Sequence, residues 1–184
     1  YAANFEGDFL SNVFAYTIDA GTGTLSAVAG SPFMAGLDPT GVTVEPSGRF
    51  VYVANRQSAN ISAYAIDGAT GALLEIAGSP YAGGIDLAVD PTGKFAYVAG
   101  NGILAYTINA TTGTLTAIGA FAAGAGAYRV AIDPSGQFAY AVNRDGNDIS
   151  AYRMNATSGA LTSIGAAVPA GIRPQAITTT RKIP

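Results

Sequence analysis

Charged side chains at the ends of predicted strands are the groups of this chain best suited to bind or convert a ligand. They are Arg56, Arg144, Arg129, Asp86, Asp38 and Arg173. The guanidinium group of arginine binds a carboxylate or phosphate through two parallel hydrogen bonds. Arg56, Arg129 and Arg144 therefore predict a site for an anionic ligand. The alternative is that these side chains form exposed ion pairs, which contribute little to stability.

Carboxylates set the limits of the acid–base chemistry that the chain can perform. The sequence contains no His and no Cys, which excludes a Ser-His-Asp triad, a histidine general base and a thiolate nucleophile. In an enzyme, Glu6 or Asp86 would then have to activate water, and the sequence alone assigns no catalytic residue. The repeated turns offer one clear side-chain oxygen ligand each, so neither a metal nor a cofactor is predicted.

The elements that must position these groups come from a repeated sequence. The phrase at residues 50–55 returns at residues 95–100 and 138–143, and a truncated copy opens the chain at residues 1–4. Copies follow one another at spacings of 42 to 48 residues. Repeats of this length are typical of propellers, solenoids and arrays.

Each repeat reads as four short strands. In the second repeat they are predicted at residues 49–55, 61–66, 72–77 and 85–89, and Asp-Pro-Thr-Gly turn chemistry follows the last one. Four antiparallel strands in about 45 residues form one blade of a β-propeller. The sequence thus predicts an all-β single domain over residues 1–184, with blades at about 1–47, 48–92, 93–135 and 136–184.

Aromatic residues and loop lengths separate scaffold from candidate site. Tyr16, Tyr64, Tyr106 and Tyr152 recur once per repeat, and we expect them to pack between blades rather than to form an aromatic ligand cage. The connection from the second to the third strand differs in each repeat. We therefore expect an uneven mouth on one face, with Gly41, Asp86, Arg129 and Pro174 in one column around it.

Composition excludes several classes of partner. Hydrophobic residues make up 49% of the chain and charged residues 11%, and the net charge is −3. Without a basic patch, nucleic acid is excluded as a partner. No uninterrupted run of about 18 apolar residues occurs, so no membrane span is predicted.

Two groups of phrases carry a family resemblance. They are residues 90–99 and 60–67, supported by Ala-Gly-Ser-Pro followed by an aromatic residue at 29–33 and 77–81. They resemble the YVTN-type and lactonase-type β-propeller repeat family, which includes 6-phosphogluconolactonase-like proteins. The resemblance implies seven blades, many extracytoplasmic members and lactone hydrolysis in a minority. Only Arg56 and Arg144 match an Asn-Arg phrase of the family, and the histidine of its enzymes is missing.

The ends of the chain look like two parts of one blade. The chain starts at a second strand and ends with a predicted first strand at residues 173–180, so the two ends would complete one blade. Three arrangements satisfy this: a self-closed ring of four blades, an eight-bladed pair of chains, or part of a seven-bladed propeller. We favour the self-closed ring, with the pair close behind.

Three hypotheses for function remain at this point. The first is a non-catalytic, extracytoplasmic propeller that acts as a binding or assembly module, and on this hypothesis the chain is not an enzyme. Its partners would be other protein chains or copies of itself, with a small anionic ligand or a glycan as further possibilities. The second is a lactonase-like hydrolase of an anionic sugar lactone, and the third is a glycan-binding propeller. The family points to a secreted, periplasmic or cell-surface location.

Overall fold

The computed structural model describes residues 1–5 and 11–180, and the described chain is built from antiparallel β-sheets. The N-terminal unit holds five short strands: β1 Ala2–Phe5, β2 Ser11–Phe14, β3 Tyr16–Ile18, β4 Leu25–Ala27 and β5 Phe33–Met34. The second sheet holds β6 Pro39–Val44, β7 Phe50–Asn55, β8 Asn60–Ile66, β9 Leu73–Glu75 and β10 Tyr81–Ala82. No helix of the described ranges is long and apolar enough to cross a membrane.

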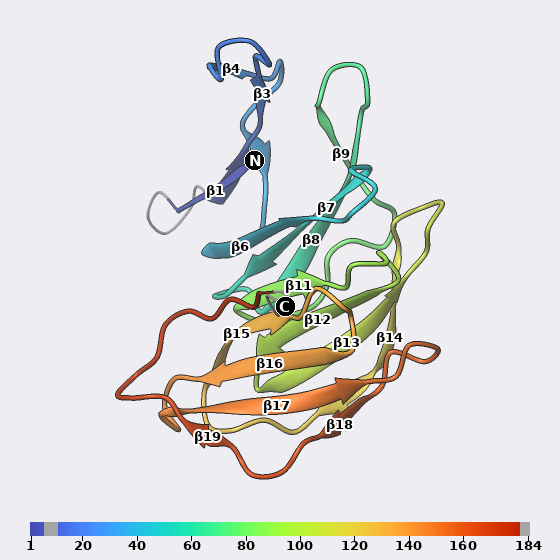
Figure 1. Cartoon of the computed structure of the whole chain (residues 1–184). Helices are drawn as coiled ribbons and strands as arrows, with labels where there is room; N and C mark the ends of the chain where they lie inside the picture. Colours follow the sequence, from blue (N-terminus) through green and yellow to red (C-terminus); the bar gives the residue numbers. More distant parts are fainter. Residues whose placement is uncertain (6–10, 181–184) are drawn as a thin grey trace.

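Two further sheets complete the described chain. The third sheet holds β11 Asp86–Val89, β12 Phe95–Gly100, β13 Gly102–Ile108 and β14 Leu115–Phe121. The fourth sheet holds β15 Ala127–Ile132, β16 Phe138–Asn143, β17 Asp148–Met154, β18 Leu161–Ser163 and β19 Val168–Pro169. The first strand of each sheet, β6, β11 or β15, pairs with the second, and the second pairs with the third. These meandering sheets confirm the predicted all-β propeller fold (Figure 1).

The turns between the first and second strands are fixed by a carboxylate. Glu45 accepts hydrogen bonds from the backbone N–H groups of Ser47 and Arg49, at 2.8 and 2.9 Å. Burial by itself would raise the pKa of Glu45, but the hydrogen bonds from Ser47, Arg49 and Phe50 outweigh it and lower that pKa. Asp90 and Asp133 accept the equivalent backbone bonds, from the residues two and four positions further on, in the next two turns. The three carboxylates therefore belong to the scaffold.

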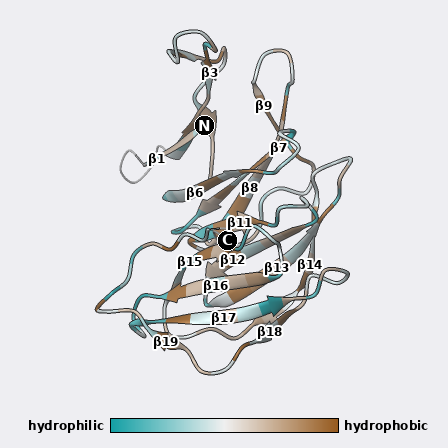
Figure 2. Cartoon of the chain, in the orientation of Figure 1, coloured by the Kyte–Doolittle hydropathy of each residue, from teal (hydrophilic) through white to brown (hydrophobic). Residues whose placement is uncertain are grey.

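Tyrosines join each sheet to the next. Tyr64, Tyr106 and Tyr152 are buried, and each hydroxyl donates to a backbone carbonyl of the preceding unit, as in the 2.6 Å bond from Tyr106 to Ala82 of β10. Hydrophobic residues run along the strands that face one another (Figure 2). The expected packing role of the repeated tyrosines is confirmed for these three, whereas Tyr16 is 38% exposed.

The N-terminal unit, which holds the sheets β1-β2-β5 and β3-β4, and the three sheets that follow it form an open arc. The inner strands pack in series, β1 on β6, β6 on β11 and β11 on β15, and the N-terminal unit and the fourth sheet lie at opposite ends (Figure 1). Residues 173–180 form no strand, but the Thr179 hydroxyl donates to the carbonyl of Ile132 on β15 at 2.8 Å. The described chain is therefore a partial propeller, and the self-closed ring that we favoured is not the arrangement it adopts.

Candidate functional site

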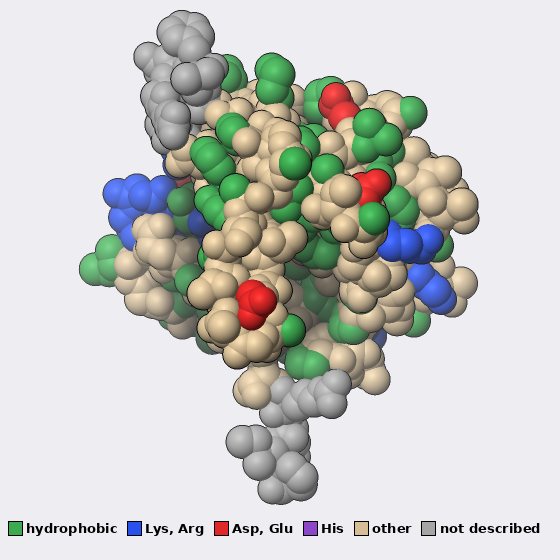
Figure 3. Space-filling model, turned by 90° about the horizontal axis from the view of Figure 1, so that it is seen from above, with side chains coloured by type: hydrophobic (Ala, Val, Ile, Leu, Met, Phe, Trp, Pro, Cys, Tyr) green, Lys and Arg blue, Asp and Glu red, His purple; other side chains and the backbone are tan. Residues whose placement is uncertain are grey.

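The predicted site residues fall into two separate groups on the described chain. Asp38 and Arg56 form an ion pair in the second sheet. Asp86, Arg129 and Arg144 lie where the third and fourth sheets meet. Figure 3 shows few charged side chains, scattered over a face made mainly of hydrophobic and uncharged groups. No three acidic residues of the described ranges gather in a way that could hold a metal ion.

In the second sheet, Arg56 and Asp38 bond to each other through both their side chains and their backbones. Arg56 Nε donates to Asp38 Oδ2 at 2.5 Å, and the Arg56 backbone N–H donates to the Asp38 carbonyl at 2.8 Å. The Ser11 hydroxyl accepts from the Asp38 backbone N–H at 3.1 Å. Asp38 holds a left-handed backbone with φ of 54°, a conformation that aspartate tolerates better than most residues. Because Asp38 already forms an ion pair with Arg56, this arginine is less available to an anionic ligand than the sequence predicted.

Asp86 is a partly buried carboxyl at the entry to β11. Its side chain is 17% exposed, and Oδ2 accepts from the backbone N–H of Val130 at 3.1 Å. Burial raises the pKa of Asp86, while the Val130 N–H and the charge of Arg129 oppose that rise. Arg129 Nη1 stands 3.9 Å from Asp86 Oδ1, which is too long for a hydrogen bond. A side chain at Gly41 in the second sheet would collide with this carboxyl, because its Cβ would lie 2.8 Å from Asp86 Oδ1. The glycine at this position therefore leaves space for Asp86.

Tyr128 organises the two arginines of the fourth sheet. The guanidinium carbon of Arg129 lies 4.6 Å from the centre of the Tyr128 ring, and that of Arg144 lies 5.0 Å from it. Both distances are within the range of cation–π attraction. Arg129 Nη1 and Arg144 Nε are buried and have no hydrogen-bond partner in the described structure. Two cations with unused N–H groups beside one ring form a site suited to an anion.

A β-bulge places Tyr128 in this position. Ala127 pairs with Asn143 and Arg129 pairs with Val142, so Tyr128 is an extra residue on β15. Sequence reasoning missed Tyr128, because a strict alternation along the strand gave it no role. Thr40 occupies the same bulge in the second sheet. The sequence signal that could have identified Tyr128 is the difference between the repeats at this bulge, where the second sheet has Thr40 and the fourth has tyrosine.

The remaining predicted residues lie apart from this cluster. The Arg173 backbone N–H donates to Asn147 Oδ1 at 2.7 Å, in the turn after β16. Glu6 lies outside the described residues. Gly41, Asp86 and Arg129 occupy equivalent positions, because they pair with the equivalent residues of β7, β12 and β16. Their place around a channel mouth stays a prediction. Pro174 lies in the segment that forms no strand.

Comparison with known families defines the class of the protein. The sequence profile described as "Lactonase, 7-bladed beta-propeller" matches residues 1–85 and 80–176. These matches cover most of the chain, so the chain belongs to this lactonase-type β-propeller family. Among curated proteins, none matches the sequence.

Solved structures share the fold over about half of their own length. A 6-phosphogluconolactonase-like protein from Bacteroides uniformis has a TM-score of 0.76 at 22% identity, over 92% of this chain and 55% of its own. One from Bacteroides fragilis has a TM-score of 0.77 at 21% identity, over 95% and 55%. The periplasmic gluconolactonase of Pseudomonas aeruginosa has a TM-score of 0.73 at 20% identity, over 90% and 50%. At these identities the likeness establishes the fold.

The family match corrects our first hypothesis for function. We expected a non-catalytic binding or assembly module, mainly because the chain has no His, no Cys and few charges. That hypothesis is wrong, since the matching family is one of lactonases and the similar structures include 6-phosphogluconolactonase-like proteins. The missing histidine misled the reasoning, because a carboxylate can also activate water. Glycan binding stays an untested prediction.

Proposed function

We propose that this chain forms part of a lactone hydrolase that acts on an anionic sugar lactone. One observation carries the proposal: the partly buried carboxyl of Asp86 lies beside Arg129, and Arg129 shares the Tyr128 ring with Arg144. This cluster combines a carboxyl of raised pKa with two arginines that have unused N–H groups. Membership of the lactonase family supports the reaction type.

Arg144 and Arg129 would bind the substrate through its charge. Both guanidinium groups lie beside the Tyr128 ring, and a guanidinium group can bind a carboxylate or phosphate through paired N–H groups. Stacking on Tyr128 restricts both guanidinium groups, so less conformational freedom is lost when a ligand binds. Arg56 has a secondary role in this proposal, because Asp38 already pairs with it.

Asp86 would act as the general base. Its carboxylate takes a proton from a water molecule, and the water oxygen adds to the lactone carbonyl carbon. The bond between that carbon and the ring oxygen then breaks, and the ring oxygen takes back from Asp86 the proton that the water gave up, which makes it a hydroxyl group and restores the carboxylate. Because burial raises the pKa of Asp86, its carboxylate is a stronger base than an ordinary aspartate. Arg129 lies next to Asp86, with 3.9 Å between Nη1 and Oδ1, and its positive charge would stabilise the negative charge that develops on the lactone carbonyl oxygen.

The chain spans about half the length of similar structures, so the activity of the whole protein is part of the proposal. Residues outside this chain can add groups to the site. An extracytoplasmic location also belongs to the proposal, and the likeness to a periplasmic gluconolactonase supports it.

The test is hydrolysis of a panel of sugar-acid lactones with and without a phosphate group. We expect hydrolysis above the uncatalysed rate, and a loss of about 100-fold in kcat/KM for Asp86→Asn. Since the pKa of Asp86 is raised, activity should increase as pH rises through a value above that of ordinary aspartate. Glu75→Gln, at an exposed position of β9, is the matched control and should leave kcat/KM unchanged. Equal activity of Asp86→Asn and the unchanged chain would contradict the proposed base.

A further inference from the structure

The segment that leads into the bulge at Tyr128 is tied to the rest of its sheet through Ser150. The Gly124 backbone N–H donates to Ser150 Oγ at 3.2 Å, and Asn143 Nδ2 donates to the same oxygen at 2.8 Å. Ser150 is buried, with an exposed fraction of 9%. One hydroxyl oxygen on β17 thus accepts hydrogen bonds from the end of β16 and from the segment before β15.

Tyr152 adds a second tie to the same segment. Its hydroxyl donates to the carbonyl of Ala122 at 2.6 Å, two residues before Gly124. Burial raises the pKa of Tyr152, and a hydrogen bond with the Ser150 side chain opposes that rise. The two hydroxyl groups therefore hold residues 122–124 at two points and also bond to each other.

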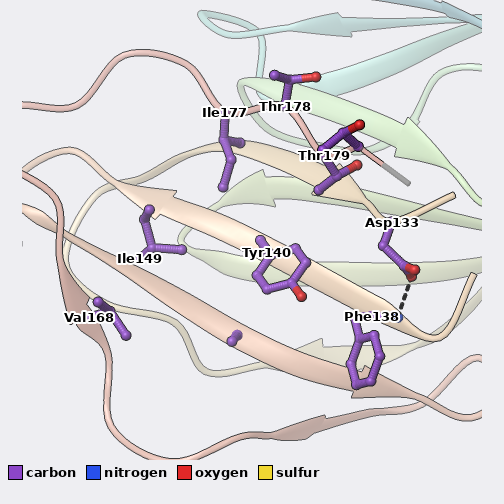
Figure 4. Close-up of a pocket in the computed structure, with 10 residues that line it drawn as sticks. Asp133, Phe138, Tyr140, Ile149, Val168, Ile177, Thr178 and Thr179 are labelled. Atoms are coloured by element: carbon purple, nitrogen blue, oxygen red, sulfur yellow. Dashed lines mark hydrogen bonds between the residues drawn. The ribbon is translucent and has the colours of Figure 1, made fainter. Parts of the chain in front are cut away.

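The alternation along β17 places both hydroxyl groups on the face that meets the third sheet. Figure 4 shows Ile149 and Tyr140 at a pocket on one face of the fourth sheet. Successive side chains of a strand point to opposite faces, so Ser150 points away from that pocket. Tyr152 packs in the hydrophobic cluster that contains Phe95 of the third sheet. The Asp86 and arginine cluster lies where the same two sheets meet.

The second sheet repeats these bonds at the equivalent residues. Ser62 Oγ accepts from the Gly36 backbone N–H at 3.3 Å and from Asn55 Nδ2 at 3.0 Å. The first strand of this sheet, β6, carries the same bulge, with Thr40 as the extra residue. The serine, the asparagine and the bulge therefore occur together in both sheets.

Among the three sheets that the structure describes in full, the third has neither the serine nor the bulge. Leu104 stands at the position of Ser150, and Gly100 stands at that of Asn143. Its first strand, β11, pairs with β12 without a register shift. A bulged strand needs bonds that hold the segment before the extra residue, and the serine supplies one of them in each sheet that has the bulge.

We propose that Ser150 is a positioning residue of the candidate lactonase site, an inference that rests on the function proposed above. Its hydroxyl holds the segment that enters β15. That segment sets the bulge at Tyr128, whose ring stacks with Arg129 and Arg144. The two guanidinium groups are then ordered before an anionic ligand arrives, which lowers the entropic cost of binding it.

Ser62 supplies a matched control, because its bonds serve a bulge that has no part in the proposed anion site. The extra residue there is Thr40, whose hydroxyl donates to the carbonyl of Ile85 in the third sheet at 2.5 Å. The arginine of that sheet, Arg56, is already paired with Asp38. A loss of the serine hydroxyl in the second sheet should therefore affect stability and leave the anion site intact.

The first experiment compares Ser150→Ala with Ser62→Ala in the hydrolysis of an anionic sugar lactone. Each change removes the acceptor of the same two hydrogen bonds, so both should lower the urea midpoint to a similar degree. Ser150→Ala should raise KM by about fivefold or more and change kcat by less than about twofold, because Asp86 is held by the third sheet. Ser62→Ala should leave both constants within about twofold. An equal rise in KM for Ser62→Ala would overturn the proposal.

The second experiment needs no activity. The guanidinium carbon of Arg144 lies 5.0 Å from the centre of the Tyr128 ring, so the ring current shifts the resonance of the buried Nε–H proton. Two-dimensional ¹H–¹⁵N NMR follows this resonance, which Arg144→Gln identifies by its loss, and Tyr128→Leu shows its position without the ring. Ser150→Ala should move it towards that position, whereas Ser62→Ala should leave it in place.

The two measurements separate the role of Ser150 from the proposed function. If the unchanged chain hydrolyses no lactone of the panel, the proposed function fails, and the NMR experiment alone decides whether Ser150 positions Arg144. If the chain is active but Ser150→Ala leaves both KM and the Arg144 resonance unchanged, the positioning role is wrong and the lactonase function stands.

Discussion

The second and fourth sheets carry the same Asn-Arg phrase but use its arginine differently. Asn55 Nδ2 donates to Asn60 at 2.8 Å and to Ser62 at 3.0 Å. In the fourth sheet, Asn143 makes the same two bonds, to Asp148 at 2.6 Å and Ser150 at 2.8 Å. Both asparagines are fully buried. The asparagine is therefore a scaffold residue that fixes the hairpin.

The arginines diverge because of the residue that faces them. Arg56 pairs with Asp38, which supplies a carboxylate at the entry to β6. The equivalent position before β15 is Gly126, which has no side chain, and Arg144 stacks on Tyr128 instead. The same Asn-Arg phrase thus contains an arginine whose charge Asp38 neutralises, Arg56, and an arginine whose buried Nε–H has no partner in the described structure, Arg144. The function of a repeated residue depends on its partner from another strand.

The largest expected effect separates the two arginines in catalysis. On the best lactone substrate, Arg144→Gln should lower kcat/KM by about 100-fold, since it removes a cation from the proposed anion site. Arg56→Gln should change kcat/KM by less than about threefold, because Asp38 already neutralises that charge. Arg144→Lys is the control that keeps the charge but not the planar donors. Equal losses for both arginines would remove the distinction between the sheets.

A smaller effect should appear in stability when the asparagines are changed. Asn55→Ala leaves buried polar groups without partners, and we expect a loss of about 2 kcal/mol in the free energy of unfolding. Asn143→Ala should cost about 1 kcal/mol more, because its acceptor is the carboxylate of Asp148 rather than an amide. Urea unfolding at one protein concentration measures both. If the order were reversed, the charge of Asp148 would not be what distinguishes the hairpins.

The smallest effect tests whether Asp38 is what makes the second sheet different. Asp38→Gly gives this sheet the residue that the fourth sheet has. The half-exposed ion pair contributes less than about 1 kcal/mol, and glycine relieves a similar cost of the positive φ. The free energy of unfolding should therefore change by less than about 0.5 kcal/mol. Asp38→Ala keeps the backbone strain and should lose more, so a lower stability for the glycine variant would contradict this reasoning.

The fold was largely predictable, because its signals are local. Turn carboxylates such as Asp90 bond to backbone groups only a few residues away. The equivalence of Gly41, Asp86 and Arg129 followed from counting back from these turns, and the strand register confirms it. The anion cluster was predicted only in part. Tyr128 was missed because a β-bulge removed it from the alternating pattern, and the assignment of the six site residues to a ligand stays a prediction.

The sequence by itself determined the number of repeated units, their strands and the packing role of most repeated tyrosines. These features depend on turn chemistry and on alternating hydrophobic residues, which act over short distances along the chain. Only the tertiary structure decided which arginine is neutralised and how one sheet covers the next. Asp38 meets Arg56 from the segment before β6, and the turn at Gly159 of the fourth sheet covers Phe95 of the third. Such contacts depend on how whole sheets stack, and no single repeat contains that information.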